Sequence, residues 1–165
     1  MSSAFLKEEA FDVDLSPPRP QSPWTNYVTP RGLKQIQSTI SQLESQLAKK
    51  VSAESLQDET VRSALERQLA FWLERLNRAV LVDPLQQSYG EVRFGARVSL
   101  CNESGDHFIV DIVGEDEAEP ANGRISWVSP IAKALLGARE GDQVVWVKPK
   151  GPESLEVLSI RGIED

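Results

Sequence analysis

Residues 29–51 read TPRGLKQIQSTISQLESQLAKKV, and residues 58–79 read DETVRSALERQLAFWLERLNRA. In the first stretch, apolar residues recur at alternating steps of three and four, at Leu33, Ile36, Ile40, Leu43 and Leu47. The second stretch repeats this alternation at Leu65, Leu69, Trp72, Leu76 and Ala79. Such spacing predicts two helices that pack along a coiled-coil seam.

The segment between the two seams decides how the helices are connected. Thr29 can cap the first helix and Pro30 suits its first position. The seam phase breaks in polar residues 52–59, so we expect a turn at 52–57 between arms 30–51 and 58–79. Each arm would then have about 22 residues and a length of about 33 Å, and the two would form an antiparallel hairpin. The alternative is one continuous helix that dimerises, because no Gly or Pro marks the turn.

The residues after the hairpin are typical of a small α+β domain. Asp83-Pro84 ends the second helix, since the residue before proline is disfavoured in the α region. One short helix is expected, capped by Ser129, opened by Pro130 and ended by Gly137. Turn residues separate short β-type runs at 91–94, 97–101, 107–113, 124–128, 143–147 and 155–160. We therefore expect a curved antiparallel sheet that wraps one short helix.

Composition divides the chain into three segments. Residues 1–24, with four prolines between positions 17 and 23, are expected to be a flexible leader. Residues 25–84 hold the hairpin, and residues 85–165 form the α+β domain. The last segment has eight basic and fourteen acidic side chains, within a chain of net charge −7. This acidity argues against binding nucleic acid through its phosphates.

Several function classes are disfavoured by residues that the chain lacks. A single cysteine, Cys101, allows no internal disulfide and favours a reducing compartment. No apolar run approaches 18 residues, and the first residues do not resemble a secretory signal. His107, the only histidine, has no partner set for a triad or a metal site. We expect a soluble, cytoplasmic, monomeric protein without catalytic residues or a metal site of its own.

Three ordered motifs resemble a known family. They are FGARV at 94–98, IVGEDEA at 112–118, and ISWVSPIAKALLG at 125–137 followed by Gly141-Asp142. Upstream, TPRGL at 29–33 is similar to the start of the coiled coil in the same proteins. Together these motifs resemble the GreA/GreB transcript cleavage factors over about residues 27–160.

The resemblance implies a fold and a partner. Gre-type factors join an antiparallel coiled coil to a C-terminal domain of FKBP-like fold. That domain docks at the rim of the secondary channel of bacterial RNA polymerase, and the coiled coil enters the channel. In this chain the docking loop corresponds to Val128, Ser129, Pro130 and Ile131. The position of Val128 is usually polar in the family, so this contact is expected to be altered.

The resemblance does not carry over to the catalytic tip. Cleavage-competent members have a Gly-Asp-x-x-Glu-Asn-Ala tip motif, whose acids help hold a second Mg²⁺ at the polymerase active site. This chain lacks the motif, and Glu54, Asp58 and Glu59 lie at the expected tip. Carboxylates suit Mg²⁺, but acids at a helix start more often cap the helix or interact with its dipole. Each arm is also about seven residues, or about 10 Å, shorter than the Gre pattern.

We therefore expect a transcription elongation regulator that binds RNA polymerase core and stimulates cleavage weakly or not at all. No cofactor is expected apart from a Mg²⁺ shared at the polymerase active site. A Rnk-like competitor at the same channel is one alternative. The FKBP-like fold raises the alternative of a peptidyl-prolyl isomerase, although fold is weak evidence for function. A generic coiled-coil adaptor is the third alternative.

Overall fold

The protein, here as a computed structural model, is described for residues 13–50 and 56–165. Its residues form two compact units. The helical unit contains the leader up to Pro23 and residues Ile36–Asn77. The β unit contains Trp24–Gln35 and Arg78–Asp165, so the first residues of the first helix belong to it.

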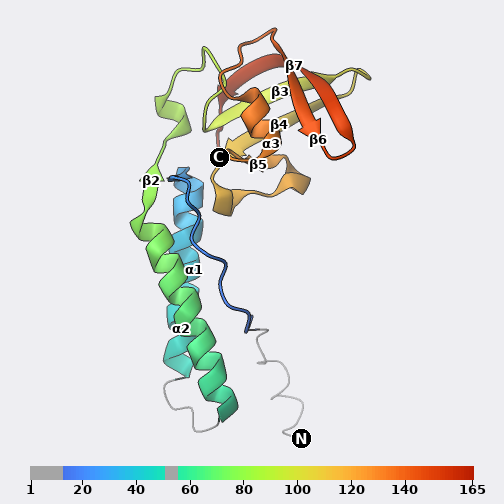
Figure 1. Cartoon of the computed structure of the whole chain (residues 1–165). Coiled ribbons are helices and arrows are strands. Elements are labelled where there is room, and N and C mark those ends of the chain that lie inside the picture. The colour runs from blue at the N-terminus through green and yellow to red at the C-terminus, as the bar shows by residue number, and fades with distance from the viewer. Residues whose placement is uncertain (1–12, 51–55) are drawn as a thin grey trace, which may run out of the picture. The chain divides into compact units, whose positions relative to one another are not determined.

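The helical unit is a hairpin of two antiparallel helices, α1 (Pro30–Lys49) and α2 (Leu56–Asn77) (Figure 1). The predicted arms are confirmed to within about two residues at each end, and the continuous helix is ruled out. The predicted seam of α1 is buried at Ile36, Ile40 and Leu43. Most of the predicted turn falls on residues 51–55, which lie outside the described residues.

The face of α2 that carries Gln68 and Phe71 contacts the leader. The side-chain amide of Gln68 donates a hydrogen bond to the Asp14 carbonyl (2.6 Å), and that of Gln21 donates to the Phe71 carbonyl (3.0 Å). The Arg19 guanidinium lies 5.0 Å from the centre of the Phe71 ring. Gln68 and Phe71 are three residues apart, so they share one face of the helix. We call residues 14–21 the leader strap; the sequence predicted no partner for it.

The β unit contains a five-stranded sheet in the order β5-β4-β3-β7-β6 (Figure 1). The strands are β3 (Ala96–Asn102), β4 (His107–Val113), β5 (Arg124–Ser126), β6 (Gln143–Lys148) and β7 (Gly151–Gly162). Neighbouring strands are antiparallel except β4 and β5, so the sheet is mixed rather than wholly antiparallel. The helix α3 (Pro130–Leu135) packs on the sheet through Ile131, Ala132 and Leu135, which join the main core cluster.

Two parts of the β unit differ from the sequence prediction. Residues 91–94 were predicted to be a strand, but they form a bend and a turn. Their apolar pattern reflects the burial of Val92, whose N–H donates to the Ala138 carbonyl at 2.8 Å rather than to a strand. Conversely, β1 (Asn26–Val28) and β2 (Ala79–Leu81) form a parallel pair that was not predicted. Ala79, predicted to lie on the α2 seam, is in β2.

Short 3₁₀ helices connect the remaining elements. They are η1 (Pro84–Gln86), η2 (Glu115–Glu117) and η3 (Pro120–Asn122). The residues of η2 are all acidic, and such runs are usually solvated, but Glu117 is buried at 3% exposure. Burial of a charged group requires partners, because an unpaired buried ion is very unfavourable.

The partners of Glu117 hold the start of α1 in the β unit. Its carboxylate accepts hydrogen bonds from the hydroxyl and the N–H of Thr29 and pairs with Arg124 at 3.3 Å. Arg124 also contacts Asp165 at 3.6 Å. Gly32 faces this carboxylate so closely that an added Cβ would lie 2.3 Å from it. Thr29, whose hydroxyl also caps the Gly32 N–H at 3.1 Å, is therefore tied to a buried acid from a distant loop; we call this set the Glu117 network.

Candidate functional site

The loop before α3 is built by local capping. Ser129 is the N-cap, and its hydroxyl accepts a hydrogen bond from the Ala132 N–H at 3.4 Å. Pro130 follows at the first helical position, where a missing N–H costs nothing. The chain thereby presents an exposed proline ring on a short helix whose other face is buried.

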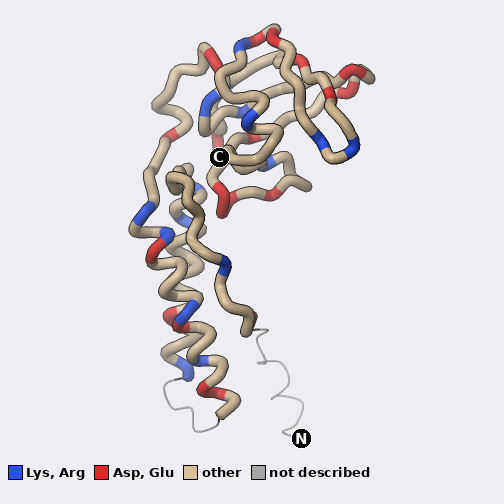
Figure 2. Tube along the Cα trace, viewed as in Figure 1, with Lys and Arg blue, Asp and Glu red and all other residues tan. Residues whose placement is uncertain are grey.

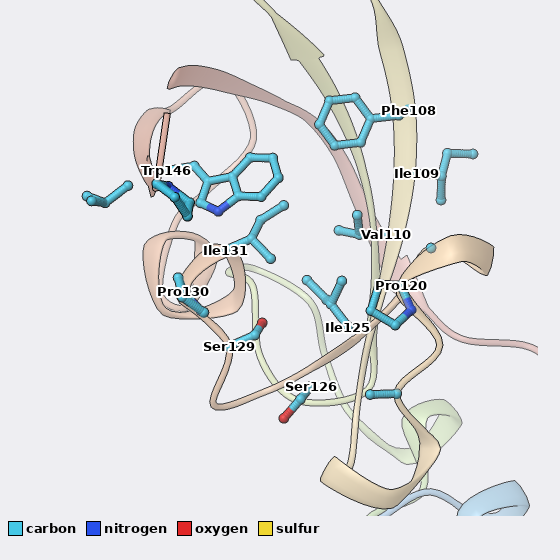
Figure 3. Close-up of a pocket in the computed structure, with 14 residues that line it drawn as sticks. Phe108, Ile109, Val110, Pro120, Ile125, Ser126, Ser129, Pro130, Ile131 and Trp146 are labelled. Atoms are coloured by element: carbon cyan, nitrogen blue, oxygen red, sulfur yellow. The ribbon is translucent and has the colours of Figure 1, made fainter. Parts of the chain in front are cut away.

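An open pocket of about 660 Å³ lies beside this loop. In Figure 3, Ser129, Pro130 and Ile131 line one wall, while Phe108 and Val110 of β4 and Ile125 of β5 line another. The remaining lining residues are mostly apolar and include Ile109, Ala118, Pro120, Gly123, Ser126, Trp146, Val147 and Pro149. None of the described residues that line the pocket is charged. Such a concave apolar surface suits apolar side chains of a partner.

Three of the four predicted docking residues line this pocket. Ser129, Pro130 and Ile131 do so, and Val128 does not. The half-buried Val128 instead donates its N–H to the Ser126 hydroxyl at 3.3 Å. Sequence reasoning missed the opposite walls, above all Phe108 and Trp146. In the sequence they stand among apolar neighbours such as Ile109, Val145 and Val147, so no alternation of polar and apolar residues marked which way they face.

One edge of the pocket carries a paired lysine. The Lys148 ammonium lies 4.8 Å from the centre of the Trp146 ring and 2.7 Å from the Glu153 carboxylate. The hydrogen bond from Lys148 lowers the pKa of Glu153 below its ordinary value, so this carboxylate stays ionised. Figure 2 shows basic residues gathered at the turn between β6 and β7.

The predicted tip acids do not assemble into a metal site in the part of the chain that is described. Asp58 and Glu59 lie in the first turn of α2, and Asp58 pairs with Lys50 at 3.5 Å. Glu54 lies outside the described residues. Across residues 13–50 and 56–165, no three His, Cys, Asp or Glu side chains come together as a metal ion would require. Acids at this position suit the dipole of α2.

The described helices were also compared with the requirements for crossing a membrane. None of them is both long enough and apolar enough to span a bilayer.

Comparison with known proteins places these features in context. The family model described as transcription elongation factor, GreA/GreB, C-term matches residues 86–162. Transcription elongation factor GreB of Neisseria meningitidis serogroup B is 34% identical over 155 residues, which cover 84% of this chain and 95% of that protein. GreA of Alkalilimnicola ehrlichii is 43% identical over 89 residues, covering 53% of this chain and 56% of that protein.

A solved structure is also similar. It is the GreA factor homolog 1 (Gfh1) protein of Thermus thermophilus, with 25% sequence identity and a TM-score of 0.41. The match covers 84% of this chain and all of that one.

Proposed function

This chain belongs to the GreA/GreB family of transcription elongation factors, and from that premise we propose that it regulates transcription by binding RNA polymerase through the pocket beside Ser129 and Pro130. The polymerase rim around the secondary channel is the proposed docking place, as the resemblance to Gre-type factors implies. The activity is proposed to belong to the complex, because any RNA cleavage would use the polymerase active site.

The observation that carries this proposal is the apolar pocket itself. Its walls come from β4, β5, β6 and α3, and Pro130 forms an exposed edge. Protein interfaces gain most of their affinity from a few apolar or aromatic side chains that fill well-packed, desolvated pockets. A pocket of about 660 Å³ without charged lining can accept such side chains from a polymerase surface element.

The helical hairpin is proposed to enter the channel without supporting efficient cleavage. Its helices of 20 and 22 residues extend about 30 Å and 33 Å. Positioning a catalytic metal tolerates little displacement, and these arms are about 10 Å shorter than the Gre pattern. The ion pair between Asp58 and Lys50 also supports a structural role for that carboxylate. An occupied channel would then exclude longer channel-binding factors.

Binding of core polymerase by the full chain tests the docking proposal. Pro130→Asp places a charge at the edge of the apolar pocket, so we expect affinity to fall at least tenfold. Leu85→Asp is the matched control, because Leu85 is an exposed apolar residue of the same unit that does not line this pocket. Far-UV spectra should be unchanged for both variants.

The outcomes separate the candidate functions. Equal affinity of Pro130→Asp and the unmodified chain would overturn the pocket as the docking site. Family membership gives the peptidyl-prolyl isomerase and adaptor alternatives no support. Turnover of a proline peptide by the unmodified chain, together with no binding of core polymerase, would favour the isomerase instead.

A further inference from the structure

The exposed face of α3 continues beyond the docking proline. Ile131, Ala132 and Leu135 are buried against the core, whereas Pro130 and Lys133 are exposed. Pro130 and Lys133 are three residues apart, which places them next to each other on one helix face. A partner seated against Pro130 would therefore also meet Lys133.

Lys133 is held by an aromatic residue from another part of the β unit. Its ammonium lies 5.3 Å from the centre of the Trp24 ring, within the range of a cation–π contact. Trp24 in turn packs edge-on against Trp127 at 6.2 Å between ring centres. Trp127 contacts Tyr27 in the same way at 5.1 Å, which continues the row of rings into the unit. The ring that contacts Lys133 is thus itself held in place by packing against Trp127.

The Lys133 ammonium has a cation–π contact with Trp24 but no carboxylate partner among the described residues. None of the carboxylates that are described lies within 4.0 Å of its ammonium, although Lys148 at the pocket edge has such a partner. Residues 85–165 carry fourteen acidic and eight basic side chains, so Lys133 is an exposed cation on a segment of net negative charge. Trp24 is 49% exposed and leaves part of its ring open beside that cation.

We infer that Trp24 and Lys133 form a second recognition element, in which Lys133 binds a carboxylate on the polymerase surface and Trp24 holds Lys133 in place. This inference rests on the proposed docking at Pro130. The occupant is the polymerase surface proposed to seat Pro130, because Lys133 lies on the same exposed face of α3, and its ammonium favours a carboxylate on that surface.

The two residues have different roles. Lys133 contacts the partner. Its charge orients the two proteins as they dock and contributes a salt-dependent part of the affinity. Trp24 is a positioning residue, since its ring restrains the flexible lysine stem and lowers the entropy lost on binding. If the pair acts as one element, replacing Trp24 should reduce the affinity for core polymerase only slightly once Lys133 has already been replaced.

The experiment measures affinity of the full chain for core polymerase at about 50 mM and about 300 mM salt. We expect Lys133→Glu to weaken binding about tenfold at low salt and Lys133→Arg to stay within about twofold of the unmodified chain. Trp24→Ala should weaken binding about threefold. The double variant Trp24→Ala, Lys133→Ala should bind with nearly the same affinity as Lys133→Ala alone. The loss caused by Lys133→Ala should shrink at high salt, which a purely structural role would not explain.

A charge reversal elsewhere on the same unit controls for net charge. Arg161→Glu suits this purpose, because Arg161 is exposed on β7 next to the buried Ile160 and so points away from α3. We expect it to leave affinity within about twofold of the unmodified chain.

Two results would overturn the inference in distinguishable ways. If Pro130→Asp weakens binding while Lys133→Glu and Trp24→Ala stay within twofold, the docking proposal stands and this recognition element does not. If the unmodified chain fails to bind, or Pro130→Asp is neutral, the docking proposal fails and the inference falls with it.

Discussion

Glu117 shows how a single residue can be essential to a fold without touching a ligand. Its carboxylate is buried between the cap of α1 and Arg124, and a glycine at position 32 leaves room for it. Gly114 also donates its N–H to this carboxylate at 3.3 Å. Removing one member of such a buried pair leaves the other charge uncompensated.

We therefore predict that Glu117→Ala lowers the free energy of unfolding by about 3–5 kcal/mol. The reason is that Arg124, whose side chain is only 6% exposed, would lose its nearer carboxylate partner. Urea denaturation followed by circular dichroism measures the change.

The neighbouring Glu119 provides a matched control for this prediction. It is exposed, and its carboxylate accepts a hydrogen bond from Asn122 at 2.8 Å. Glu119→Ala should lower the free energy of unfolding by less than about 1 kcal/mol. Equal losses for the two variants would show that the Glu117 network contributes no more than a surface contact.

Among the elements, the leader strap adds a third layer of chain to the hairpin. Its contacts come from Arg19 and Gln21 at one point on α2 and from the Asp14 carbonyl at another. An exposed cation–π contact and a side-chain hydrogen bond each contribute about 1 kcal/mol. Together they should keep the strap on α2 most of the time.

We predict that the double variant Arg19→Ala, Gln21→Ala releases the strap. If each contact contributes about 0.7 kcal/mol, in the lower part of the usual range, the combined loss of about 1.4 kcal/mol would raise the population of the open state about tenfold. Brief chymotrypsin treatment should then cleave after the exposed Leu15 about tenfold faster, as read by mass spectrometry. Arg67→Ala, at an exposed position of α2, should leave the rate unchanged. An unchanged rate in the double variant would mean that the strap contacts are not populated in solution.

The elements that the sequence predicted well are those with a long, regular pattern. The seam of α1 spans four turns, and Ser129, Pro130 and Gly137 mark α3 unambiguously. By contrast, β1 and β2 have three residues each and pair across 53 positions of sequence, too short for any periodicity. Residues 91–94 have the pattern of a strand because Val92 is buried, although it pairs with no strand.

The candidate site was predictable only in part for a related reason. Capping signals are local, so Ser129, Pro130 and Ile131 could be found from sequence. The opposite walls come from strands that the order β5-β4-β3-β7-β6 brings to the pocket. No local pattern states that order, so Phe108 and Trp146 could not be assigned to a pocket wall from the sequence. The Glu117 network was missed because acidic runs are usually solvated.

For the whole molecule, the decisive question is what the bound factor does to a backtracked polymerase. We predict that it leaves a labelled transcript in a stalled complex largely intact in the presence of Mg²⁺. The acidic tip motif is absent from the sequence, and shorter arms would leave any carboxylate about 10 Å from its expected position. A long-arm family member added afterwards should cleave more slowly, because the proposed docking would leave the channel occupied.

The double variant Asp58→Ala, Glu59→Ala is the control for that assay. It should behave like the unmodified chain, since both acids lie in the first turn of α2, where they suit the helix dipole. Rapid shortening of the transcript that disappears in this variant would show instead that the tip reaches the active site and works there.

The Glu117 network also bears on the order in which the chain can fold during synthesis. The hydrogen bonds between Thr29 and Glu117 join residues 88 positions apart. Both helices of the hairpin end well before residue 117, so the ribosome releases them while the partner of Thr29 has not yet been made. The hairpin can pair early, and the Thr29 hydroxyl can already cap the Gly32 N–H, but the hydrogen bonds from Thr29 to Glu117 must wait for the β unit. Truncated nascent chains that end before residue 117 would therefore carry a capped α1 whose Thr29 has no buried carboxylate partner.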